Sequence, residues 1–253
     1  MRYLLFIAII LSACGNAVVH SKENVVQKNN TSFEPVAVIE LFTSQGCSSC
    51  PPADALLNTT IADAKKTNKN IFALSFHVDY WNRLGWADPF SSAAFSQRQR
   101  AYVNSLQLDG AYTPQMIVNG TNECVGSDKA ALTSNINKAL NQQALVLVKD
   151  LRAIYGEHIK VHYALDGQYK GETINFALVS LSETTFVKRG ENNGRTMTSE
   201  NIVRQLITKD AAASGDVEFE AGNGFSKDAM AVIAFVQEQG NKKIIGAAKT
   251  SLE

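Results

Sequence analysis

The distribution of apolar residues predicts two kinds of structure along the chain. Residues 36–44 (VAVIELFTS) and 70–81 (NIFALSFHVDYW) are apolar runs rich in β-branched and aromatic residues, which is typical of buried strands. Between them, residues 51–68 carry apolar side chains at helical spacing after two prolines, and the first turn of a helix tolerates proline. We therefore expect a βαβ unit with parallel strands.

The rest of the first half predicts two more helices, over residues 92–106 and 129–143, and a hairpin that turns at Asn119-Gly120. Beyond about residue 144, short segments alternate between apolar and polar residues, which indicates a β-sandwich. These segments are 144–156, 158–165, 173–182, 216–221, 229–239 and 242–250. The expected fold class is an α/β domain at residues 36–142 followed by an all-β, sandwich-like domain at residues 145–250.

The N-terminus predicts export. Arg2 precedes the apolar stretch YLLFIAIIL, which is too short to span a membrane, and LSAC closes it with small residues. LSAC followed by Gly15 resembles a bacterial lipobox, so we expect residues 1–14 to form a lipoprotein signal with Cys14 lipidated; an ordinary signal peptide cut elsewhere is the alternative. Residues 15–35 are rich in Asn, Ser and Lys, which predicts a flexible tether. The expected location is extracytoplasmic, on a bacterial envelope membrane and facing the periplasm, or secreted.

Composition narrows the classes of partner. The 253 residues include 24 basic and 24 acidic residues, with no concentration of Lys and Arg, so nucleic acid is not an expected partner. The 45% hydrophobic content supports a packed core. Disulfides persist outside the cytoplasm, which bears on the four cysteines of the chain.

Cys47 and Cys50 form a C-x-x-C motif between the first predicted strand and the first predicted helix. The positive end of a helix dipole favours a thiolate, so Cys47 is the expected nucleophile and Cys50 the resolving cysteine. Two alternatives stay open: a structural Cys47–Cys50 disulfide without turnover, and a copper site made by both cysteines with His77. A second C-x-x-C motif is absent, which argues against structural zinc, and we expect no metal and no cofactor.

The order of elements resembles the thioredoxin fold, in which a cis-proline faces the dithiol. That resemblance implies a cis Thr113-Pro114 bond close to Cys47, with Pro114 in the catalytic site and the Thr113 backbone binding substrate. Three segments, ELFTSQGCSSCPPAD, FHVDYWNRLGWADPFSS and GENNGRTMTSENIVRQL, resemble the motif blocks of bacterial secreted domain-of-unknown-function family 1223. The resemblance spans residues 36–250 and implies membership of the thioredoxin-like class, but no particular reaction.

Other residues near the motif have both a functional and a structural reading. His77 is either a proton relay or a hydrogen-bonded core residue, and Trp81 and Trp86 either bind substrate or support a long loop. Cys124 suits a buried strand position, and a role as a third redox partner is the alternative. The third motif block, with Arg195, Thr196 and Asn201, fixes a domain interface or lines a shared cleft.

The function expected from these features is that of an extracytoplasmic thiol–disulfide oxidoreductase. Its partners would be exported proteins with cysteines, or a redox partner, and the lipid on Cys14 would hold it on a membrane. The alternatives are a non-enzymatic envelope binding module with a structural disulfide and a thioredoxin-like copper-binding protein.

Overall fold

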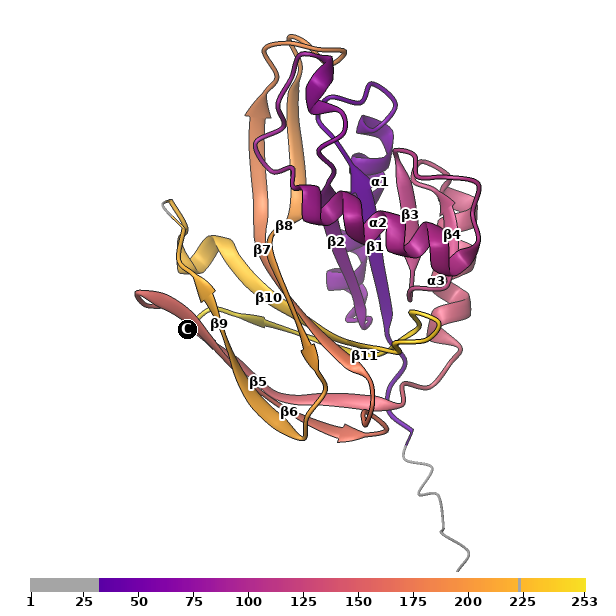
Figure 1. Ribbon diagram of the computed structural model, residues 1–253, viewed down its shortest axis with the longest axis vertical. Coiled ribbons are helices and arrows are strands. Elements are labelled where there is room, and N and C mark those ends of the chain that lie inside the picture. Colours follow the sequence, from indigo (N-terminus) through magenta and orange to yellow (C-terminus); the bar gives the residue numbers. More distant parts are fainter. Residues whose placement is uncertain (1–31, 223) are drawn as a thin grey trace, which may run out of the picture. The chain divides into compact units, whose positions relative to one another are not determined.

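The two apolar runs form neighbouring parallel strands in the computed structural model, which describes residues 32–222 and 224–253 (Figure 1). Strand β1 (Ala37–Thr43) pairs with β2 (Ile71–His77) from Ala37↔Ile71 to Thr43↔His77, and helix α1 (Pro51–Thr67) connects them. The predicted βαβ unit is confirmed. Its carboxyl edge brings the ends of both strands to the start of α1.

The other elements predicted in the first half are also present. Helix α2 (Ala93–Leu106), strands β3 (Gln115–Val118) and β4 (Asn122–Val125), and helix α3 (Lys129–Leu140) follow in that order. The β3–β4 turn places Asn119 at φ 46° and Gly120 at φ 72°, the left-handed conformation that this dipeptide favours.

The second half is built of strands, most of them at the predicted segments. They are β5 (Val146–Ile154), β6 (His158–Gly167), β7 (Thr173–Phe186), β8 (Thr196–Asp210), β9 (Ser214–Glu220), β10 (Met230–Gln237) and β11 (Ile244–Ser251). Two short 3-10 helices, η1 (Asn82–Leu84) and η2 (Lys227–Ala229), interrupt the loops.

The expected fold class, a thioredoxin-like α/β domain followed by a sandwich-like domain, is wrong. Strands from both halves join one mixed eight-stranded sheet in the order β11-β10-β7-β8-β2-β1-β3-β4. In this sheet the halves meet at β2 and β8, which pair in parallel at Ser75↔Ile202. Strands hold 44% of the described residues and helices 22%. The physical reason is β8, a strand that the sequence reading missed and that gives β2 a partner on its open edge.

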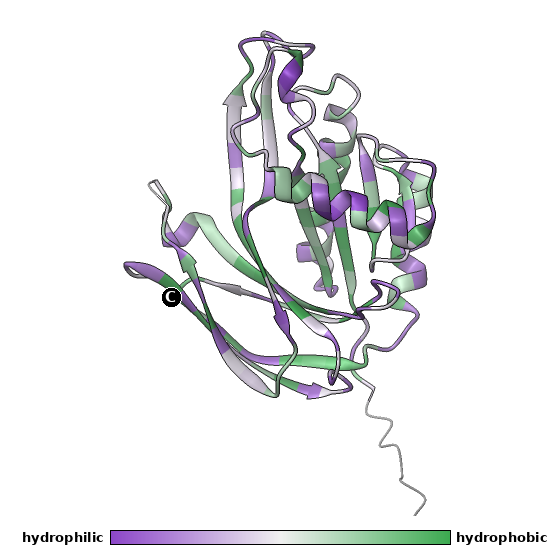
Figure 2. Cartoon of the chain, in the orientation of Figure 1, coloured by the Kyte–Doolittle hydropathy of each residue, from purple (hydrophilic) through white to green (hydrophobic). Residues whose placement is uncertain are grey.

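Three apolar clusters hold the layers together. Helix α2 covers one face of the large sheet through Phe95 and Tyr102, and α1 and α3 cover the other face through residues such as Leu57 and Leu132. A three-stranded sheet, β5-β6-β9, packs its apolar side against β7 and β10, with Phe219 fully buried. Figure 2 shows hydrophobic residues concentrated in the strands, whereas α2 alternates between hydrophobic and hydrophilic positions.

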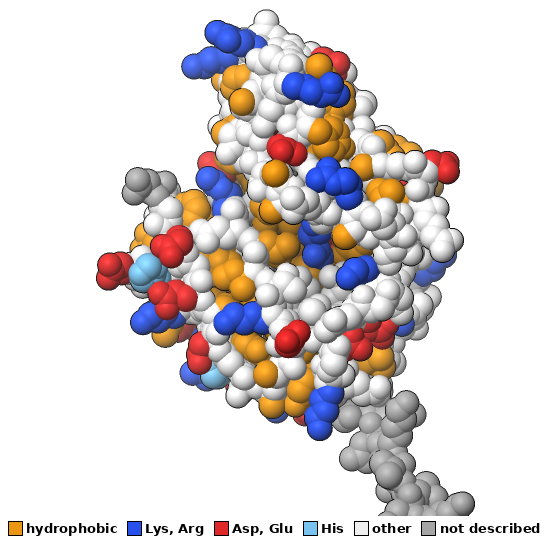
Figure 3. All heavy atoms as spheres, in the orientation of Figure 1, with side chains coloured by type: hydrophobic (Ala, Val, Ile, Leu, Met, Phe, Trp, Pro, Cys, Tyr) orange, Lys and Arg blue, Asp and Glu red, His pale blue; other side chains and the backbone are white. Residues whose placement is uncertain are grey.

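Basic and acidic side chains are interspersed on the face drawn in Figure 3. Acidic and histidine side chains gather over the three-stranded sheet, where His158 Nδ1 lies 3.5 Å from Glu218 and 3.4 Å from Glu220. Within the described part of the chain, no helix combines the length and the apolar character needed to cross a membrane.

The predicted signal at residues 1–14, the lipidation of Cys14 and residues 15–31 of the tether lie outside the described residues. The last part of the tether is described, and Phe33 there forms a β-bridge with Ala144.

Candidate dithiol site

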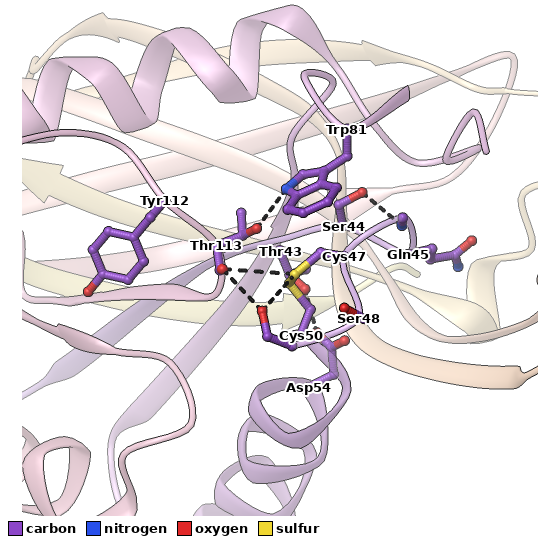
Figure 4. The surroundings of a disulfide bond; sticks show 12 residues. Thr43, Ser44, Gln45, Cys47, Ser48, Cys50, Asp54, Trp81, Tyr112 and Thr113 are labelled. Atoms are coloured by element: carbon purple, nitrogen blue, oxygen red, sulfur yellow. Dashed lines mark hydrogen bonds between the residues drawn. A yellow bond between two sulfur atoms is a disulfide. The ribbon is translucent and has the colours of Figure 1, made fainter. Parts of the chain in front are cut away.

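Cys47 and Cys50 form a disulfide at the start of α1, with their Cα atoms 5.4 Å apart (Figure 4). Neither cysteine exposes any surface, although Ser48 and Ser49 between them are exposed. The Ala53 and Asp54 amides donate to the Cys50 carbonyl, so the helix begins directly after the second cysteine. The two sulfurs therefore lie at the positive end of a helix dipole, beneath a short exposed turn.

The loop before the cysteines is folded tightly against Trp81. The Cys47 amide donates to the Ser44 carbonyl at 3.1 Å, and the Gly46 amide donates to Ser44 Oγ at 3.1 Å. A Cβ on residue 46 would lie 3.2 Å from Trp81 Cβ, closer than most such contacts. Glycine at position 46 lets this loop pass close to the Cβ atom of Trp81.

The Thr113-Pro114 bond is cis, as the resemblance implied, and it lies beside the first cysteine. The Thr113 carbonyl oxygen is 3.9 Å from Cys47 Sγ and 3.5 Å from Ser49 Oγ, while Trp81 Nε1 donates to Thr113 Oγ1 at 2.7 Å (Figure 4). The structure thus brings Cys47, Cys50, Thr113, Pro114 and Trp81 together. Their catalytic and substrate-binding roles stay predictions.

A turn from the second half of the chain holds the dithiol loop from the other side. Asn192 is fully buried. Its Nδ2 donates to the backbone carbonyl of Gln45 at 2.9 Å and to that of Cys47 at 2.8 Å. The Ser48 amide donates to Glu191 Oε2 at 3.0 Å. Residues far apart in the sequence therefore fix the backbone on both sides of Cys47.

Asp88 connects this loop to His77. Asp88 Oδ2 accepts a hydrogen bond from the backbone N–H of Gln45 and another from His77 Nδ1, each at 2.7 Å. Burial alone would raise the pKa of Asp88, but the charge of His77 and these hydrogen bonds hold it below its ordinary value. His77 is 1% exposed, and its Nε2 has no hydrogen-bond partner among the described residues. The predicted relay residue therefore reaches the dithiol loop through Asp88.

Asp54, on the first turn of α1, is the second buried acidic group of the site. It is 6% exposed and accepts a hydrogen bond from Thr43 Oγ1 at 2.9 Å. Burial raises its pKa from 3.8 to about 7, which exceeds the lowering effect of His77 and Thr43, and the charge of Asp88 adds to the increase. A carboxyl group that titrates near neutral pH thus lies one turn from Cys50.

Trp86 and Cys124 have different relations to the site. Trp86 Nε1 donates to Gln45 Oε1 at 3.2 Å, so Trp86 contacts the loop before Cys47. Cys124 is buried and free on β4, and burial raises the pKa of its thiol to about 11. Among the described residues, no group of three or more His, Cys, Asp or Glu side chains could hold a metal ion.

The sequence reading missed Asp54, Asp88, Glu191 and Asn192 as site residues. All four lie within the three motif blocks quoted above, and this is the signal that could have found them. Arg195 and Thr196, for which two readings were open, line a groove beside α1, and Asn201 Nδ2 donates to the Ala73 carbonyl at 3.0 Å.

Comparisons with known proteins identify the family and related folds. Residues 38–237 match the family model described as "Protein of unknown function (DUF1223)". The chain is similar to a protein of Agrobacterium tumefaciens with a crystal structure, at 28% identity and a TM-score of 0.65, over 88% of this chain and 98% of that one. HBP35 of Porphyromonas gingivalis shares the fold at 19% identity and a TM-score of 0.61, over 87% of this chain and 76% of that one. No curated protein matches.

Proposed function

We propose that this chain, which belongs to the DUF1223 family, carries out thiol–disulfide exchange at Cys47 and Cys50 with cysteines of exported proteins. The observation that carries the proposal is the Cys47–Cys50 disulfide at the start of α1, with the Thr113 carbonyl beside Cys47 Sγ. The resemblance to thioredoxin-like proteins supports only the chemistry that we propose for this site. The large mixed sheet is a different architecture.

The exchange begins from the oxidised state. A thiolate of a reduced substrate attacks Cys47 Sγ, the Cys47–Cys50 bond breaks, and Cys50 leaves as a thiolate. Protonated Asp54, whose pKa of about 7 keeps part of it neutral near pH 7, supplies the proton to Cys50. A second substrate thiolate then attacks the mixed disulfide, which leaves Cys47 reduced and the substrate oxidised by two electrons. The reverse sequence reduces a substrate disulfide.

Access to the sulfurs requires movement. Because Cys47 exposes no surface, an attacking thiolate reaches it only when the Ser48–Ser49 turn moves away from Thr113. Ser49 Oγ donates to the Thr113 carbonyl at 3.5 Å, a long hydrogen bond that costs little to break.

Trapping with Cys50→Ser tests the proposal. In this variant Cys47 is a free thiol, which attacks a disulfide of an exported protein and releases the second substrate sulfur as a thiolate. Without Cys50 the mixed disulfide is not resolved, so exported proteins should accumulate as covalent adducts on Cys47 that a reductant releases. Cys47→Ser is the matched control and should accumulate none. Equal capture by both variants, or capture by neither, would contradict the proposal.

A non-enzymatic binding module with a structural disulfide is the second candidate, because both sulfurs are fully buried. A measured reduction potential separates the two: structural disulfides usually lie below about −300 mV, and exchange-active ones above it. A value below that limit, without exchange on a model peptide disulfide, favours the binding module.

We also propose that the protein acts outside the cytoplasm, anchored through a diacylated Cys14. The sequence LSAC after the apolar stretch supports this, and two or more acyl chains give stable membrane anchoring. Mass spectrometry of the mature N-terminus tests it. An unmodified N-terminus downstream of Cys14 would contradict it.

A further inference from the structure

A groove of about 390 Å³ lies between the first turns of α1 and the start of β8, next to the dithiol site. The residues that line it are Pro51, Asp54, Ala55, Asn58, Arg195, Thr196, Met197 and Thr198. Pro51 directly follows Cys50, so one end of the groove adjoins the disulfide. The residues whose side chains hold the dithiol loop, Asp88, Glu191 and Asn192, do not line this groove.

The groove offers a cation without a partner. Arg195 is exposed, and within the described residues its guanidinium makes no hydrogen bond and no ion pair, while its backbone is fixed by the Val187 amide, which donates to the Arg195 carbonyl at 2.9 Å. A free guanidinium on a fixed backbone suits a carboxylate, to which it can donate two parallel hydrogen bonds.

The groove also offers an unused acceptor and an apolar floor. Asn58 Nδ2 donates to the Thr198 carbonyl at 3.2 Å, but Asn58 Oδ1 is buried and accepts no hydrogen bond from the described residues. A ligand N–H can satisfy it only when the Asn58 side chain turns out toward the groove. Pro51, Ala55 and the buried Met197 present apolar atoms between the polar groups.

We propose that this groove binds a short acidic peptide beside the dithiol, with a carboxylate on Arg195 and a backbone N–H on Asn58 Oδ1. The inference rests on the proposed function, since it names the class of substrate: a cysteine-containing peptide that carries a free carboxylate near its sulfur. The volume matches such a ligand, because pockets for small molecules begin at roughly 300 Å³.

Binding to the oxidised protein tests the groove without any exchange chemistry. The probe is S-methylglutathione, a small acidic peptide whose sulfur cannot react, and titration calorimetry measures its affinity. Arg195→Gln should weaken binding about five- to tenfold, because it removes a charged hydrogen-bond donor. Arg152→Gln, on the exposed side of β5, is the matched control and should bind like the parent.

Two further arms complete the test. The diethyl ester of the probe, which lacks both carboxylate charges, should bind as weakly to the parent as the acid binds to Arg195→Gln. Ala55→Trp should fill the groove and abolish binding, whereas Thr59→Trp, exposed one turn later on α1 and outside the groove, should not. Equal affinity of acid and ester, or unchanged binding to Arg195→Gln, would overturn the inference.

The outcome is distinguishable from failure of the proposed function. If the acidic peptide does not bind while the Cys50→Ser variant still traps exported proteins, the groove inference alone is wrong. If it binds while no exchange occurs, the groove is a site of the binding module.

Discussion

Two buried polar networks, one beneath α2 and one around the dithiol loop that follows β1, differ in how completely their hydrogen bonds are made. Beneath α2, Glu40 accepts from Arg98 Nε at 2.5 Å, from Arg98 Nη2 at 2.9 Å and from the Tyr102 hydroxyl. Gln237 Nε2 donates to the Tyr102 hydroxyl at 2.8 Å and to the Lys242 carbonyl at 2.7 Å. Every buried side-chain nitrogen and oxygen of these four residues has a partner.

The network around the dithiol is incomplete. Gln45 Nε2, His77 Nε2 and Asn192 Oδ1 are buried without partners among the described residues. Leaving a buried polar group unpaired costs about 1–3 kcal/mol, so a network built only for stability would satisfy them. From this comparison we propose that the α2 network is structural and that the dithiol network serves chemistry or binding, and the predictions below test that difference.

The largest effect is expected from breaking the complete network. Arg98→Met leaves Glu40 buried without a charge partner, so the free energy of unfolding should fall by about 3–5 kcal/mol, measured by urea denaturation. Arg100→Met, on the exposed side of the same helix, should change it by less than about 0.5 kcal/mol. The rate at which dithiothreitol reduces Cys47–Cys50 in the folded protein should not change. A faster reduction would couple the two networks and weaken the comparison.

The next effect is expected at Asp54, where substitution should raise the free energy of unfolding instead of lowering it. Its pKa rises from 3.8 to about 7 on folding, so the folded state binds the proton more tightly than the unfolded state. The free energy of unfolding should therefore fall as pH rises from about 4 to about 7 and change little above. Asp54→Asn removes that loss and should stabilise the protein at pH 8 by up to about 4 kcal/mol, with little effect at pH 4.

Urea denaturation of the oxidised protein at several pH values measures this change. Asp63→Asn, exposed on the same helix, is the control and should keep the pH dependence of the parent. A variant at position 54 that is less stable than the parent at pH 8 would show that the ionised carboxylate is a stabilising part of the site.

Local patterns predicted much of the fold and some of the site. Continuous apolar runs gave β1 and β2, and Pro51 after the C-x-x-C motif located the start of α1. Strand β8 was missed because its sequence, TMTSENIVRQLITKD, does not alternate strictly between apolar and polar residues. The strand begins with the exposed Thr196, passes through the buried Ile202 and Val203, and ends with exposed residues. Because β8 joins the two halves, missing one strand gave the wrong fold class.

The site was only partly predictable for a related reason. Sequence spacing places Cys47 near Cys50, but it cannot show that Asn192, 145 residues away, donates to the Cys47 carbonyl. The pKa of Asp54 depends on burial and on charges from β2 and the following loop, which are features of the tertiary structure.

A smaller effect is expected at Asn192, which holds the incomplete network in place. Asn192→Ala removes the donor to the Gln45 and Cys47 carbonyls, at a cost of about 1–2 kcal/mol in the free energy of unfolding. The loop should open more often, so dithiothreitol should reduce the disulfide about fivefold faster. Asn193→Ala, the exposed neighbour, is the control. An unchanged reduction rate with the same loss of stability would make Asn192 a structural residue only.

The smallest effect is expected at Glu191, which makes a similar contact in a different environment. The Ser48 amide donates to Glu191 Oε2 at 3.0 Å, and hydrogen bonds from Ser48 lower the pKa of that carboxyl, but the group is fully exposed. Water replaces an exposed hydrogen bond at little cost, so Glu191→Gln should leave the urea midpoint unchanged and raise the reduction rate less than about twofold. If Glu191→Gln accelerates reduction as much as Asn192→Ala does, the exposed turn controls access to Cys47. In that case the buried, unpaired groups beneath the loop would no longer be what distinguishes this site from the network under α2.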